Sequence, residues 1–183
     1  MINVKTVLTY DDYVALPDDD GLRYEILDGE LSVSPSPTFR HQLVVARLLG
    51  ILRAYVGAND LGEAVAAPIT VVLANTSVLQ PDIIYIAKER MNLVSARGTV
   101  DGGPTLAIEV LSPSTTPTDR GKKRQLFERY GVPYYWIVDH EARAIEIYAA
   151  NGGVYGVADR RTDDLVGLPP FPGLRIDPAQ LWR

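Results

Sequence analysis

The sequence predicts a mixed α/β (α+β) fold, in which a central mixed β-sheet is flanked by helices and a β-hairpin lies towards each end of the chain. Three observations predict it. Residues 81–87 and 105–111 are short apolar runs rich in β-branched residues, typical of strands covered on both faces. Helical periodicity occurs once before these runs and once after them, and Asx-Gly turns interrupt alternating segments near both ends. Because the 183 residues contain no repeat and no linker, we expect residues 1–183 to form a single domain.

The first part of the chain predicts a hairpin, a helix and a strand. Apolar residues alternate over residues 22–33 on both sides of Asp28-Gly29, which is a strong signal for a β-hairpin. Apolar residues then recur at helical spacing over residues 41–56. Residues 63–73 have the pattern of one strand, which Pro68 would place at the edge of the sheet.

The middle of the chain predicts an irregular segment and a second helix. Three glycines and a proline make residues 87–104 irregular. Either Thr118 or Asp119 can cap a helix that runs to Tyr130, where a glycine and then a proline prevent continuation.

The last part predicts strands and an anchored tail. Residues 134–139 form the next strand, and residues 144–158 alternate around an Asn-Gly-Gly turn as a second hairpin. The proline-rich segment 168–182 is expected to wrap over the surface and to dock through Leu181 and Trp182.

Composition excludes several classes of site. The chain has no cysteine, which rules out disulfides and thiolate metal sites, and only two histidines, His41 and His140, which argues against a multi-histidine zinc site. A metal ion would therefore have mainly oxygen ligands, as Mg²⁺ or Mn²⁺ prefers. No apolar run is long enough to span a membrane and no signal peptide is evident, so we expect a cytoplasmic protein. The net charge of −5 argues against long non-specific coating of nucleic acid.

Two carboxylates lie in surroundings that favour a dry interior. By the two-residue period of a strand, Asp82 shares a face with Ile84 and Ile86, and Glu109 shares a face with its neighbours two residues away. A buried carboxylate takes up a proton or finds a cation. Two such carboxylates on adjacent strands repel each other unless a metal ion lies between them.

A lysine also faces the interior. Helical spacing puts Lys123 on one stripe with Leu126, Phe127 and Tyr130, so its ammonium group projects from the packing face of the helix. An ammonium group there suggests a nearby anion, and Glu109 lies 14 residues upstream.

Two carboxylates and a lysine at a sheet edge suit phosphodiester hydrolysis. Carboxylates can hold one or two magnesium ions, and a lysine can orient water or balance charge on the phosphorus. Basic side chains beside Lys123 could hold the flanking phosphates, and these are Arg120, Lys122, Arg124 and Arg129.

Each of these residues also has a purely structural interpretation. Asp82 could end a turn, Glu109 could form an ion pair with an arginine, and Lys123 could extend along the helix to water. His41 could cap a helix, pack or bind substrate, and the structural role is favoured.

The order of these residues resembles the PD-(D/E)XK nuclease superfamily, which has the restriction-endonuclease-like fold. More narrowly, it resembles a branch of bacterial restriction-endonuclease-like proteins first catalogued as a domain of unknown function. The likeness covers nearly the whole chain and includes "RYEILDGELSVSPSPTFRHQ" at 23–42, "PDI" at 81–83, "IEVLSPST" at 108–115, the Asp119/Lys123 pair with Phe127, and "GVPYYWIVD" at 131–139.

The resemblance implies Asp82 and Glu109 as ligands of Mg²⁺ or Mn²⁺, and Glu25 and His41 as further positions of the family pattern. It implies DNA as the substrate, and a homodimer, because two-fold symmetry suits the cutting of both strands. The superfamily lysine stands two residues after the acid, where this chain has Leu111. Lys123 is the residue that fits an equivalent lysine on the following helix.

Two other functions remain open at this level. A catalytically silent module could keep the fold and bind nucleic acid or protein, which Leu111 and the net charge favour. A glycosidase could use Glu25 and Glu109 as an acid/base pair, although a chain with two tryptophans offers few platforms for a sugar.

Overall fold

The structure is a computed structural model that describes residues 6–17 and 21–183. Its helices are α1 (Tyr10–Val14), α2 (Phe39–Ala58), η1 (Lys88–Leu93), α3 (Thr116–Thr118), η2 (Asp119–Lys123), α4 (Arg124–Arg129) and α5 (Pro178–Leu181). Its strands are β1 (Leu22–Leu27), β2 (Glu30–Pro35), β3 (Gly62–Ala66), β4 (Val71–Ala74), β5 (Ser77–Leu79), β6 (Ile83–Ala87), β7 (Val100–Asp101), β8 (Leu106–Val110), β9 (Tyr134–Asp139), β10 (Ala144–Asn151), β11 (Val154–Tyr155) and β12 (Asp159–Arg161).

The strands form two mixed sheets, so the α/β fold class is confirmed with two sheets in place of one. The larger sheet has seven strands in the order β11-β10-β9-β8-β6-β3, with β12 also paired to β10. The smaller sheet has five strands in the order β2-β1-β5-β4-β7. Parallel pairing occurs between β8 and β9 and between β4 and β7, and the other pairs are antiparallel.

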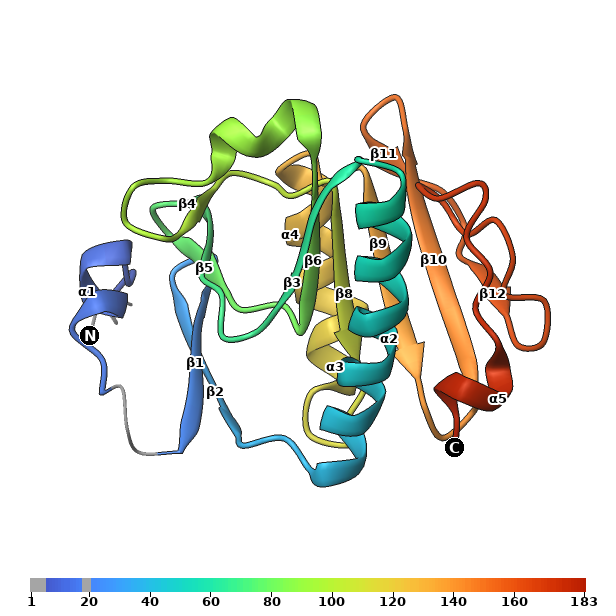
Figure 1. Cartoon of the computed structure of the whole chain (residues 1–183). Coiled ribbons are helices and arrows are strands. Elements are labelled where there is room, and N and C mark those ends of the chain that lie inside the picture. The colour runs from blue at the N-terminus through green and yellow to red at the C-terminus, as the bar shows by residue number, and fades with distance from the viewer. Residues whose placement is uncertain (1–5, 18–20) are drawn as a thin grey trace.

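Two apolar clusters cover the two faces of the larger sheet. Figure 1 shows α2 in front of the central strands and α4 behind them. On one face, buried side chains of α2 and of the C-terminal tail pack against β6, β8, β9 and β10. On the other face, α4 and the smaller sheet pack against the same central strands. This arrangement explains why the central strands are apolar throughout, because both faces of a covered strand are removed from water.

The helical segment 116–129 is the crossover between two parallel strands. It follows β8 and leads into β9, which pairs with β8 from Leu106↔Tyr134 to Val110↔Val138. Parallel neighbours need such a crossover, and its inner face must be apolar to pack on the sheet. Leu126 and Phe127 meet that need, being almost fully buried.

Several sequence predictions are confirmed. The first hairpin is β1–β2 with Asp28-Gly29 at its turn, and the second is β10–β11 around Asn151–Gly153. The tail docks as expected, because Leu181 is fully buried and Trp182 nearly so.

Three boundaries differ from the prediction. Residues 63–73 are not one strand: β3 ends at Ala66, the chain turns at a cis Ala67–Pro68 bond, and β4 joins the other sheet. Alternation cannot show this change of sheet, because both strands have period two. β3 is nevertheless an edge strand, as Pro68 suggested.

The segment 87–104 and the start of the second helix also differ. The first contains the 3-10 helix η1 and the short strand β7, so it is more regular than its glycines indicated. The second helix begins at Thr116 after the N-cap Thr115, so Asp119 lies inside the helical segment and does not cap it. Within the described ranges, no helix is long and apolar enough to cross a membrane.

Phe171 provides a test of how the tail is anchored. It is fully buried, and its ring centroid lies 4.8 Å from that of Tyr85 and 6.1 Å from that of Trp136. We expect Phe171→Ala to lower the free energy of unfolding by about 3–5 kcal/mol, because it leaves a cavity in the core. Phe39→Ala is the matched control: Phe39 is 83% exposed, and its loss should change stability by less than about 0.5 kcal/mol. Equal effects in urea unfolding would contradict a docked tail.

Candidate active site

Strand pairing brings the two predicted acids together. β6 and β8 are antiparallel with Ile83 opposite Ile108, so Asp82 and Glu109 stand opposite each other one residue further on. Both side chains face the side of the sheet that carries the cluster with Ile84, Ala107 and Leu111. Both are about 2% exposed. The predicted convergence of two buried carboxylates on one face is therefore present.

Asp82 is held by three donors. Arg23 Nη1 donates to Asp82 Oδ1 at 2.9 Å, and the backbone N–H of Val110 donates to Oδ2 at 2.8 Å. His41 Nε2 lies 3.1 Å from Oδ2 and 2.9 Å from the carbonyl oxygen of Val110. Because both of these partners are acceptors, Nε2 carries the proton. Burial by itself would raise the pKa of Asp82, but the His41 hydrogen bond and the Arg23 charge outweigh it and lower this pKa to about 2.

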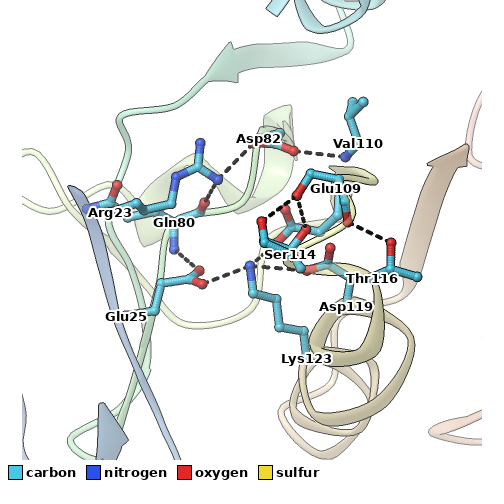
Figure 2. A network of polar contacts seen from close by, with 12 residues as sticks. Arg23, Glu25, Gln80, Asp82, Glu109, Val110, Ser114, Thr116, Asp119 and Lys123 are labelled. Atoms are coloured by element: carbon cyan, nitrogen blue, oxygen red, sulfur yellow. Dashed lines mark hydrogen bonds and ion pairs between the residues drawn. The ribbon is translucent and has the colours of Figure 1, made fainter. Parts of the chain in front are cut away.

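Lys123 is the centre of the second half of the site. Its Nζ atom lies 2.8 Å from Glu25 Oε2, 2.9 Å from Glu109 Oε1 and 3.4 Å from Asp119 Oδ1 (Figure 2). Burial opposes the charge of Lys123, yet the three carboxylates raise its pKa well above the ordinary value. The ammonium group therefore stays charged although it is only 2% exposed.

Whereas Lys123 keeps its charge, burial favours the neutral, protonated form of Glu109 and Asp119. Burial raises the pKa of Glu109 well above its usual value, and the charge of Lys123 only partly offsets this. Burial likewise raises the pKa of Asp119. The neighbouring carboxylates add to this effect of burial, since four buried carboxylates (Glu25, Asp82, Glu109 and Asp119) face two permanent cations, Arg23 and Lys123. Full ionisation would leave an excess of two negative charges, which a proton or a cation can offset.

A π-helical turn presents Asp119 and Lys123 to this cluster. η2 spans Asp119–Lys123 between the short helix α3 and α4, and both of its end residues are buried. Such turns occur frequently at functional sites because they re-aim side chains within an otherwise regular helix. The sequence predicted that Lys123 faces inward on a stripe with Leu126 and Phe127, and the structure confirms it.

A cleft of about 190 Å³ opens onto the cluster. It is lined by Asp82, Glu109, His41, Arg23 and Lys123, and by several hydroxyl-bearing residues in the segments 34–38 and 112–115. The acids are thus buried in the protein but lie beside a cavity open to a ligand.

The basic side chains near Lys123 point elsewhere. Arg120 Nη2 lies 2.6 Å from Glu146 Oε1, and Lys122 Nζ lies 3.1 Å from Asp28 Oδ2. Arg124 is paired with Glu128 at 3.8 Å and stacks over the ring of Tyr148. In the part of the chain that the structure describes, none of these three lines the cleft. Their role as phosphate ligands stays a prediction.

Sequence reasoning missed Arg23 and gave Asp119 too small a part. A signal existed for each. Arg23 is two residues before Glu25 on β1, so the strand period puts both on one face. Asp119 is four residues before Lys123, so helical spacing allows their contact. The backbone of Gln80 ties the first pair together, since its N–H donates to Glu25 Oε1 at 2.8 Å and its carbonyl accepts from Arg23 at 3.4 Å.

The donor chemistry suits a hard divalent cation. Asp82 and Glu109 supply carboxylate oxygens beside one cleft, where the surplus negative charge favours such an ion. Arg23, His41 and Lys123 already contact oxygens of these two carboxylates, so a bound metal ion would share those oxygens with them or displace them. Among the described residues, no group of three or more acids or histidines is arranged as a ready metal site.

The fold and these side chains define a protein of the restriction-endonuclease-like class. Residues 10–179 match the model of the Uma2 family, which carries the description "Putative restriction endonuclease", and the chain therefore belongs to this family. The resemblance stated from the sequence is thereby confirmed.

A solved structure supports the fold. The chain is similar to a protein from Anabaena variabilis described as a "putative nuclease belonging to DUF820", with a TM-score of 0.78 and 19% sequence identity. The match covers 96% of this chain and 97% of that protein. No curated protein sequence matches this chain.

Glu109→Gln tests the electrostatic imbalance. A raised pKa means that the folded protein binds this proton more tightly than the unfolded chain, whose value is 4.5. The stability that Glu109 contributes is thus fully present below about pH 4.5 and is lost as the pH rises. We expect Glu109→Gln to be more stable than wild type at pH 8 by about 1 kcal/mol or more. The reason is that a pKa shift of one unit between the unfolded and folded states corresponds to about 1.4 kcal/mol.

Urea unfolding at several pH values, in chelator, measures this difference, which should vanish towards pH 4. Glu63→Gln is the control, because Glu63 is exposed on β3 and should show no such trend. If Glu109→Gln is instead less stable than wild type at pH 8, the ion pair between Glu109 and Lys123 stabilises the protein by more than the burial of the Glu109 carboxylate costs.

Proposed function

We propose that the protein is a metal-dependent endonuclease that hydrolyses phosphodiester bonds of DNA. One observation carries the proposal: Asp82, directly before β6, and Glu109, on the adjacent strand β8, line one cleft, and Lys123 contacts Glu109. Membership in a restriction-endonuclease family supports a nucleic acid as the substrate.

The proposed roles follow from the contacts. Asp82 and Glu109 would hold Mg²⁺ or Mn²⁺, which polarises a phosphate and lowers the pKa of bound water. Lys123, fixed between Glu25 and Glu109, keeps its positive charge and balances the negative charge that develops on the phosphorus. His41 donates to Asp82 and so sets the direction of its carboxylate. Glu25 acts by positioning Lys123.

The wider arrangement extends this proposal. Residues 1–183 act as one nuclease-like domain, and two copies associate as a homodimer so that both strands of a duplex can be cut. Arg120, Lys122 and Arg124 can exchange their acidic partners for flanking phosphates, since ion pairs at the surface are weak.

Cleavage of plasmid DNA tests the proposal. In Mg²⁺ or Mn²⁺, we expect wild-type protein to convert supercoiled plasmid to nicked and linear forms. Asp82→Asn and Glu109→Gln should lower the rate by at least about 100-fold, because each removes a carboxylate that the metal needs. Glu63→Gln on exposed β3 should cut as wild type does. Cleavage by Glu109→Gln at the wild-type rate would refute the assigned site.

A second function is favoured by one observation: the carboxylates of Asp82 and Glu109 are already paired with Arg23 and Lys123. Such internal pairing, with Leu111 at the usual lysine position, suits a catalytically silent module that binds nucleic acid or protein. Calorimetric titration with Mn²⁺ separates the two. A nuclease site should bind Mn²⁺, and Asp82→Asn should weaken it, whereas a silent module gives no heat that depends on Asp82.

A further inference from the structure

Arg23 is the cation that a ligand in the cleft can reach. Among the described residues that line the cleft, Arg23 and Lys123 are the permanently charged cations. The Lys123 side chain is 3% exposed and is surrounded by three carboxylates, whereas the Arg23 side chain is 18% exposed. A phosphate entering the cleft therefore meets the guanidinium group before it can meet the ammonium group.

Among the described residues, the guanidinium group has partners at only one of its nitrogen atoms. Nη1 donates to Asp82 Oδ1 at 2.9 Å and to the carbonyl oxygen of Gln80 at 3.4 Å. In the described ranges, no hydrogen bond of Arg23 uses Nε or Nη2. The planar guanidinium group matches two phosphate oxygens at once, which an ammonium group does not.

Arg23 also lies where two cavities meet. It lines the catalytic cleft and a neighbouring cavity of about 230 Å³, together with Ser36 and Pro37. A nucleotide chain that runs from one cavity to the other must pass the guanidinium group. Ser36 and Thr38, which carry hydroxyl groups, also line the first of these cavities.

Arg23 and a metal ion would compete for Asp82. The guanidinium group holds Oδ1 of this carboxylate, which the proposed function assigns to the metal (Figure 2). A divalent cation beside Asp82 weakens the Arg23–Asp82 pair by occupying its oxygen and by repelling the guanidinium charge.

We propose that Arg23 is a phosphate-binding residue of this site and that it exchanges partners. In the metal-free protein it neutralises Asp82; when a divalent cation takes Asp82, its guanidinium group turns to a phosphate of the nucleic acid. The inference rests on the proposed function and adds to it a substrate contact from a residue to which the sequence analysis assigned no role.

Arg23→Gln tests the exchange through two affinities that should change in opposite directions. Removing a competing charged donor should tighten Mn²⁺ binding by about 10-fold in calorimetry. Removing the phosphate ligand should weaken binding of a short fluorescein-labelled duplex by about 10-fold in anisotropy, measured with Ca²⁺ present. Arg97→Gln is the matched control, because Arg97 is exposed and pairs with Asp101 away from the cleft.

The outcomes separate the interpretations. A merely structural Arg23 would weaken both affinities on substitution, and unchanged Mn²⁺ or DNA affinity would equally overturn the exchange. A wild-type protein that binds Mn²⁺ but cuts no DNA would contradict hydrolysis, while the two opposite changes would still support Arg23. If Arg23→Gln fails to fold, wild-type crystals soaked in Mn²⁺ decide: Nη1 should leave Asp82 Oδ1, and an intact pair beside a bound ion would refute the proposal.

Discussion

The buried ammonium group of Lys123 is the interaction on which the site depends. It bonds to Glu25 from the first hairpin, to Glu109 from the central sheet, and it pairs with Asp119 from its own helical segment. An ammonium group at this depth would lose its proton without anions around it, and three carboxylates at this depth would repel one another without a cation. These three contacts of one ammonium group therefore hold the smaller sheet, the larger sheet and the crossover helix together.

Asp82 and Glu109 line one cleft, but their pKa values are shifted in opposite directions. Hydrogen bonding to His41 and the charge of Arg23 hold the pKa of Asp82 at about 2, so this carboxylate is permanently ionised. Burial raises the pKa of Glu109 well above its usual value. The environment of each side chain, and not its chemical type, therefore sets its protonation. The surplus of buried negative charge costs stability in the free protein and is what makes the cleft suited to a cation.

Local pattern was sufficient for much of the site. The strand period put Asp82 and Glu109 on inward faces, and the helix period put Lys123 among core residues; both are correct. Pattern failed where a partner comes from a distant element. Arg23 is an ordinary exposed-looking position of a hairpin until Asp82, 59 residues later, is placed beside it. The sequence likewise gave no sign of the ion pair between Arg120 and Glu146 on β10, and the role of Arg120 as a phosphate ligand stays a prediction. The single domain over residues 1–183 and the homodimer stay predictions.

The sequence by itself determined the central strands β6, β8 and β9, the two main helical segments, both hairpin turns and which acids and lysine face inward, because these depend on periodicity and on residues within a few positions of one another. Tertiary structure decided that residues 63–73 divide between two sheets, that Asp119 joins the cluster from a π-helical turn, and that Arg23 neutralises Asp82. The physical reason is that the state of a buried charge depends on the sum of all charges and dipoles around it, and only the folded chain brings those groups within a few ångströms.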